Sequence, residues 1–245
     1  MTFAGCSASG MSPSNATVAG PSVVSQHRAE ADGKVSHATV ARAAVRGWMS
    51  PQAKAGKNVI YWGDYNTSTI TLFSNKGVNG PQLGQITEGL SEPERLFVDS
   101  QGSVYATNIG NNTVTAYKAG TTTPFLTISD GIDGPTGLAV DKNGTVYVAN
   151  VDSDTITEYK KGKTSPSLTI DAAAEYLATD SNDNLYASEY PSIVEYPKGS
   201  SNGTSLNLSN LGSPGAIEID KNAGIIVLDE SNDNVDYFPA GQTQA

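Results

Sequence analysis

The sequence predicts an all-β protein, a β-propeller of four-stranded blades, and three regularities support this prediction. An Asp that opens a turn recurs about every 40 residues, which is the length of one propeller blade. A Tyr or Ile stands near the middle of the strand that follows each turn, and an aromatic residue ends the next strand, shortly before a Gly. The turn residues are Asp99, Asp141, Asp180 and Asp220, the mid-strand residues are Tyr61, Tyr105, Tyr147, Tyr186 and Ile226, and the closing aromatics are Phe73, Tyr117, Tyr159, Tyr196 and Tyr237.

The chain divides into two parts. Residues 1–47 are rich in Ser, Ala and Gly and are interpreted as a flexible leader, with one short helix over 36–47 that Ser36 caps and Gly47 ends. Residues 48–245 are the expected propeller domain. Five repeats are visible, but the first lacks a clear inner strand and the fifth lacks a fourth strand. We therefore expect either a ring of five blades or, as the favoured alternative, a truncated six-bladed ring.

The charge restricts the class of partner. The net charge is −10, which argues against nucleic acid because phosphates attract a basic surface. No apolar run approaches the ~20 residues that span a bilayer. The expected partner is an unknown protein or small-molecule ligand, and a monomer is expected.

One cysteine, Cys6, precludes an intrachain disulfide. The segment Phe3-Ala-Gly-Cys6 resembles the end of a bacterial lipoprotein signal, which implies lipidation of Cys6 and an extracytoplasmic, envelope-anchored protein. The segment lacks a charged and an apolar region ahead of it, so an ordinary free thiol is the alternative.

The third repeat carries a family resemblance. Its Gly137-Leu-Ala-Val-Asp141, Asn143-Gly144 and Val146-Tyr-Val-Ala-Asn150 elements resemble NHL-repeat propellers, and the resemblance extends over about residues 57–241. The wider superfamily includes gluconolactonase-like hydrolases and streptogramin lyases, so the resemblance implies a fold and leaves the activity open.

Polar residues are expected to gather at one mouth of the central channel. One set lies just ahead of the inner strands and a second set ends the second strands. The first set is Glu94, Thr136, Glu175 and Gly215, and the second is Asp64, Asn108, Asn150, Glu189 and Asp229. Their carboxylate and amide oxygens would suit Ca²⁺. The alternative, which we weigh more heavily, is that these residues cap backbone groups at strand ends.

Arg95 and Tyr176 stand beside the first set and are further candidates for ligand contact at the mouth. Arg95 could instead pair with Glu94 or a neighbouring acid. The resemblance to gluconolactonase-like enzymes implies a divalent ion held partly by residues ahead of inner strands, where Glu94 and Glu175 stand. Thr136 and Gly215 depart from that ligand pattern.

The leading hypothesis is a non-enzymatic, extracytoplasmic propeller that acts as a binding or interaction module. The histidines His27 and His37 both lie outside the repeats, which disfavours acid–base chemistry of the lyase type. The alternative is a divalent-metal-dependent hydrolase of the gluconolactonase type, in which a bound ion would polarise a carbonyl or activate water.

Overall fold

The computed structural model describes residues 4–5, 47–50, 59–76 and 80–244. Three residues named in the sequence analysis lie outside the described residues: Cys6, His27 and His37. The helix expected over 36–47 also lies outside them, except for Gly47. The described part of the chain contains no helix of the length and apolarity that crosses a membrane.

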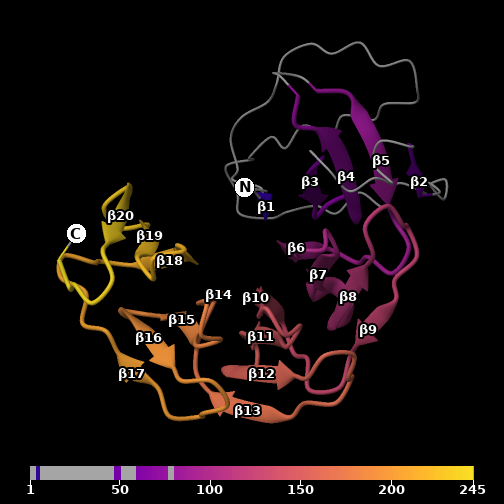
Figure 1. The fold of residues 1–245 in the computed structure, drawn as a ribbon. Helices are drawn as coiled ribbons and strands as arrows, with labels where there is room; N and C mark the ends of the chain where they lie inside the picture. The colour runs from indigo at the N-terminus through magenta and orange to yellow at the C-terminus, as the bar shows by residue number, and fades with distance from the viewer. Residues whose placement is uncertain (1–3, 6–46, 51–58, 77–79, 245) are drawn as a thin grey trace, which may run out of the picture.

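The predicted all-β propeller is confirmed, because the strands form five sheets, antiparallel except for one short pair in the first, that follow one another around a common centre (Figure 1). The first blade contains β3 (Val59–Asp64), β4 (Thr69–Ser74) and β5 (Gln82–Ile86), with β1 (Ala4–Gly5) parallel to β3 and β2 (Trp48–Met49) antiparallel to β5. The second contains β6 (Pro93–Val98), β7 (Val104–Asn108), β8 (Thr113–Tyr117) and β9 (Leu126–Ile128), with a short 3₁₀ helix η1 (Ile109–Asn111). The third contains β10 (Pro135–Val140), β11 (Val146–Asn150), β12 (Thr155–Tyr159) and β13 (Leu168–Asp171). The fourth contains β14 (Tyr176–Thr179), β15 (Leu185–Glu189), β16 (Ser192–Tyr196) and β17 (Thr204–Ser205), and the fifth contains β18 (Pro214–Ile219), β19 (Ile225–Asp229) and β20 (Asn234–Phe238).

The turn chemistry expected of the repeated Asp is present in every copy. Each Asp accepts hydrogen bonds at Oδ1 from the backbone N–H groups two and four residues later, as Asp141 does from Asn143 at 2.8 Å and Thr145 at 2.8 Å. Gly144 then adopts a φ of 83°, which a residue without Cβ tolerates. The same pair of bonds is made by Asp99, Asp180 and Asp220.

Each blade has two apolar faces. We call the face toward the next blade in sequence the front face and the face toward the preceding blade the back face. In the third blade, Tyr147 and Ile156 belong to the front face and pack on the fourth blade, whereas Val146, Val148 and Tyr159 belong to the back face and pack on the second blade. Both faces are buried, so the second strand shows no alternation of apolar and polar residues.

One detail of the repeat was assigned wrongly from sequence. Tyr237 was expected to end the third strand of the fifth repeat as its closing aromatic. The register pairs Ile225 with Phe238 and Val146 with Tyr159, so Phe238 is the equivalent of Tyr159. Phe238 is buried in the back face and Tyr237 is exposed, because adjacent residues of a strand point to opposite faces.

The blades form an open arc. The inner strands of neighbouring blades pack together, β3 on β6, β6 on β10, β10 on β14 and β14 on β18. Within the described residues no strand of the fifth blade packs in this way on the first, and Figure 1 shows the arc open between them.

Candidate functional site

The candidate site lies where the inner strands β6, β10, β14 and β18 begin around the centre of the arc (Figure 1). The register of three of these strands shifts at their first residues, between Pro93 and Leu96 in β6 and at the equivalent places in β10 and β18. Such bulges turn side chains away from the regular pleat. They include Glu94, Thr136 and Gly215, which are three of the four residues predicted for the first set.

Arg95 and Tyr176 meet across the site. The Arg95 guanidinium carbon lies 4.3 Å from the centre of the Tyr176 ring, within the range of a cation–π contact. The Tyr176 hydroxyl donates to Glu230 Oε1 at 3.3 Å. Burial raises the pKa of Tyr176, and the neighbouring Arg95 opposes that rise. These contacts connect the second, fourth and fifth blades.

The position of Arg95 follows from its strand. Its backbone N–H donates to Thr107 Oγ1 at 2.9 Å, and the Thr107 hydroxyl in turn donates to the carbonyl of Thr136 at 3.4 Å. The Thr136 hydroxyl oxygen is shielded from solvent and has no hydrogen-bond partner among the described residues. A buried hydroxyl without a partner is costly in the absence of a ligand or water.

Several carboxylates lie near this contact: Glu94 directly precedes Arg95, and Glu175 and Glu230 both act on Tyr176. Glu94, Glu175 and Glu230 are exposed. Glu92 accepts a hydrogen bond from the Tyr65 hydroxyl at 3.1 Å. Partial desolvation, together with the Glu92 and Glu94 carboxylates, raises the pKa of Tyr65. The arrangement is therefore a guanidinium stacked on a phenol ring within an acidic rim.

Three residues of the second set have structural roles. Asn108, Asn150 and Asp229 are almost fully buried at the ends of β7, β11 and β19. Each accepts a hydrogen bond from the backbone N–H of the residue 17 positions earlier, on the loop that leads into its own blade. They hold the mouth loops in place, and their oxygens are used in doing so.

Asp229 is the most heavily bonded of the three. Its two oxygens accept from the N–H groups of Gly212 and Ser213, from Ser231 and from Asn232. These donors, the Gly212 N–H first among them, hold the pKa of Asp229 well below its usual range.

The other two members of the second set also have partners. Asp64 accepts from the Thr67 N–H at 2.9 Å within its own turn. Glu189 accepts from the Tyr196 hydroxyl at 2.6 Å. Burial raises the pKa of Glu189, and that hydrogen bond opposes the rise. Among the described residues, no three His, Cys, Asp or Glu side chains form a group that could hold a metal ion.

Sequence reasoning missed Tyr65, Glu92 and Glu230. Each lies in a loop next to a predicted member of the two sets: Tyr65 follows Asp64, Glu230 follows Asp229, and Glu92 precedes Glu94 by two residues. Their position beside the predicted residues, in the same loops, was the signal that could have identified them. The predicted Gly215 is buried and has no side chain to contribute.

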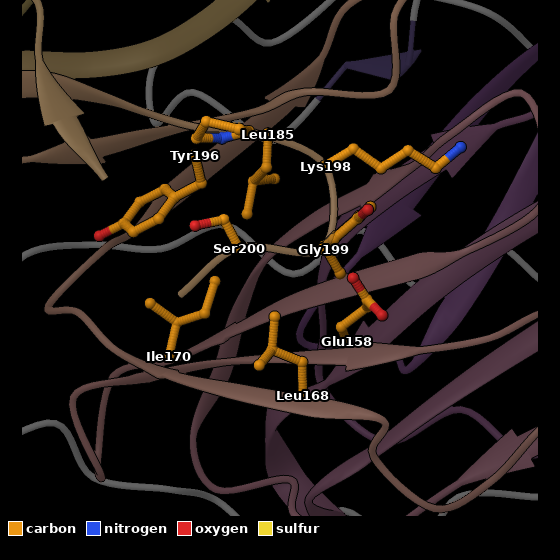
Figure 2. A pocket seen from close by; sticks show the side chains of 10 residues that line it. Glu158, Leu168, Ile170, Leu185, Tyr196, Lys198, Gly199 and Ser200 are labelled. Carbon is orange, nitrogen blue, oxygen red and sulfur yellow. The ribbon is translucent and has the colours of Figure 1, made fainter. Parts of the chain in front are cut away.

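A second polar cluster lies away from the mouth, between the third and fourth blades (Figure 2). Glu158 is buried there beside Leu168, Ile170 and Leu185, and its Oε1 contacts Lys160 Nζ at 2.5 Å and the Ser167 hydroxyl at 2.7 Å. The space has no room for a water molecule, so the cluster is part of the interface between the two blades.

Comparison with known proteins gives a likeness of fold. No protein-family model matches the chain, and no curated protein sequence matches it. Among solved structures, it is similar to a hydrazine synthase of Kuenenia stuttgartiensis, with a TM-score of 0.55 and 17% identity over 62% of this chain and 47% of that one. It is similar to a streptogramin B lyase, with a TM-score of 0.58 and 14% identity over 76% of this chain and 66% of that one. A chain of a mitotic checkpoint complex matches with a TM-score of 0.60 and 14% identity over 75% of this chain and 59% of that one.

The alignments therefore span less than two thirds of each of these structures. At such identities the likeness establishes the propeller fold, as the resemblance to NHL-repeat propellers implied.

Proposed function

We propose that this protein is a binding module whose channel mouth takes a positively charged ligand or a basic segment of a partner protein. The observation that carries the proposal is that the Tyr176 ring, whose hydroxyl donates to the Glu230 carboxylate, already holds a cation, the Arg95 guanidinium, 4.3 Å from its centre. Residues from three blades are held together there, as expected of a surface arranged before its ligand arrives.

The charge at the mouth supports a cationic partner. Glu94 and Glu175 directly precede Arg95 and Tyr176 in the chain, Glu230 accepts a hydrogen bond from Tyr176, and Glu92 lies in the loop just before Glu94. The whole chain has a net charge of −10. An acidic rim attracts cations and accelerates their encounter with the protein.

A tetralysine peptide is a suitable probe, with tetraglutamate as its matched control, and titration calorimetry at two salt concentrations measures binding. We expect tetralysine to bind, and its affinity to fall at high salt because the attraction between exposed charges is screened. Replacing Glu94 and Glu175 together by Gln should weaken binding about tenfold, equivalent to about 1.4 kcal/mol.

The variant Arg95→Ala gives the sharper result. Removing the guanidinium makes the rim more acidic and uncovers the face of Tyr176, which attracts cations. We expect tetralysine to bind more tightly to this variant. Binding of tetraglutamate that Arg95→Ala abolishes would show the opposite ligand class and would refute the proposal.

The cellular location is part of the same proposal: an extracytoplasmic monomer, anchored through a lipid on Cys6. Its support is the sequence around Cys6 and the single cysteine. Mass spectrometry of the protein isolated from its native host should show an acylated Cys6, and an unmodified thiol would refute the anchor. Analytical ultracentrifugation should give the mass of one chain, and the mass of a dimer would refute the monomer.

A further inference from the structure

The two blades at the ends of the arc each have an apolar face that lies open. The back face of the first blade contains Ile60 and Trp62 on β3, which are 41% and 46% exposed. The front face of the fifth blade contains Leu228 on β19 with Val235 and Tyr237 on β20, and Val235 is 64% exposed. These are the faces through which blades pack elsewhere in the molecule.

The repeat shows that the equivalent side chains in other blades are buried. Ile60 and Trp62 pair with Phe73 and Thr71, and in the second blade Val104 and Ala106 pair with Tyr117 and Thr115 in the same register. Val104, Ala106 and their counterparts in the third, fourth and fifth blades are all buried. The back face of the first blade therefore has the composition of a packed face.

The front face of the fifth blade also has side chains whose equivalents in other blades are buried. Val235 pairs with Leu228 as Val114 pairs with Thr107 and Ile156 with Ala149. Val114, Ile156 and the fourth-blade equivalent Ile193 are buried in the cores between blades. An apolar patch at positions that are otherwise interior indicates an interaction surface.

The front face also carries a charge. Glu218 on β18 is exposed on the same side as Val235, where the equivalent residues Ala139 and Ala178 are buried. Partial desolvation raises the pKa of Glu218. A partner that covered this face would need a basic group opposite Glu218, because a buried carboxylate without a partner is costly.

We infer that the opening between the first and fifth blades is a socket for one further four-stranded antiparallel sheet, apolar on both faces and basic opposite Glu218. Its back face would cover Val235 and Tyr237, and its front face would cover Ile60 and Trp62. Both contacts continue the front-to-back packing that joins the five blades. Closing the arc on itself would instead shift the four close-packed cores between blades, which resist deformation.

The probe is a copy of residues 163–205, which contain the last strand of the third blade and the whole fourth blade, appended after residue 245. The copy of 168–171 supplies a fourth strand beside β20, and the copy of 176–205 supplies the added sheet. We expect the melting temperature to rise by about 5 °C or more, since the new interfaces bury apolar surface that the parent exposes. Binding of the dye ANS should fall.

Matched variants locate the effect. Val235→Glu and Trp62→Glu should each cancel most of the gain in the extended protein while leaving the melting temperature of the parent nearly unchanged. Glu218→Gln should raise the melting temperature of the extended protein, because the copy has no basic residue among the apolar side chains of its back face, and should leave the parent unaffected.

Three outcomes would overturn the inference. The first is an extended protein that melts like the parent. The second is a parent dimer that Val235→Glu dissociates, which would mean that a second copy covers the face. The third is a monomeric parent strongly destabilised by Trp62→Glu or Val235→Glu, which would mean that another part of the same chain already covers these side chains.

Discussion

Removing the Asn150 side chain should destabilise the propeller strongly, because this residue connects a mouth loop to the sheet beneath it. Asn150 is 1% exposed. Its Oδ1 accepts from the Asp133 N–H at 3.1 Å, and its Nδ2 donates to Thr157 Oγ1 at 3.1 Å. In Asn150→Ala both partners lose this bond, and the Thr157 oxygen stays buried.

The magnitude follows from those two groups. A buried polar group that loses its partner costs about 1–3 kcal/mol. The Asp133 loop is near the surface, so its N–H should recover part of the loss from water. We expect a decrease of about 2–3 kcal/mol in the free energy of unfolding, and a melting temperature lower by about 4–12 °C for a domain of this size.

Urea unfolding and calorimetry measure both quantities. The control is Asn182→Ala, because Asn182 is an exposed turn residue, and its change should stay within about 0.5 kcal/mol. Asn108→Ala should match Asn150→Ala, since Asn108 makes the same bond over the same 17 residues. If Asn150→Ala unfolds like the Asn182 control, the assigned capping role is wrong.

Three further outcomes are expected. The low pKa of Asp229 in the folded protein means that its contribution to stability is present above the unfolded pKa of about 3.9 and is lost as the pH falls below that value. In acid titration, the stability of Asp229→Asn should therefore fall less steeply with pH than that of the parent protein. Burial raises the pKa of Tyr117 to about 12, so the contribution of Tyr117 to stability should be lost as the pH rises from about 10 toward 12. Tyr117→Phe should remove this pH-dependent step. It also removes the 2.6 Å hydrogen bond to the Glu88 carbonyl, at a cost of about 1 kcal/mol at neutral pH. Gly137→Ala would place a Cβ 2.8 Å from the Glu175 carbonyl oxygen, and chemical unfolding should show a loss of about 1–3 kcal/mol; unchanged stability would mean that the neighbouring strand moves easily.

Sequence reasoning was most successful where the interactions are local. The Asp turns were predicted because Asp141 bonds to N–H groups only two and four residues later. The order of the strands was predicted from the repeat. A repeat indicates the residue at which a strand ends less exactly. This is why Tyr237 was mistaken for Phe238, its neighbour on the opposite face.

The candidate site was predicted only in part. Arg95 and Tyr176 were identified as neighbours of the mouth, but their contact was not, because it crosses from the second blade to the fourth. Asn108, Asn150 and Asp229 were placed at strand ends correctly. Their role as anchors for the mouth loops was not predicted. That role depends on how the loops fold back, and the residue types at the strand ends do not determine it.

The sequence by itself determined the strands, the turns and the apolar character of both blade faces, since these depend on residues close together in the chain. The tertiary structure decided which polar groups meet. The Tyr176 hydroxyl and Glu230 are 54 residues apart, and they come within hydrogen-bonding distance through the curvature of the arc. The same curvature leaves Trp62 and Val235 uncovered, because it results from packing between blades and no single repeat specifies it.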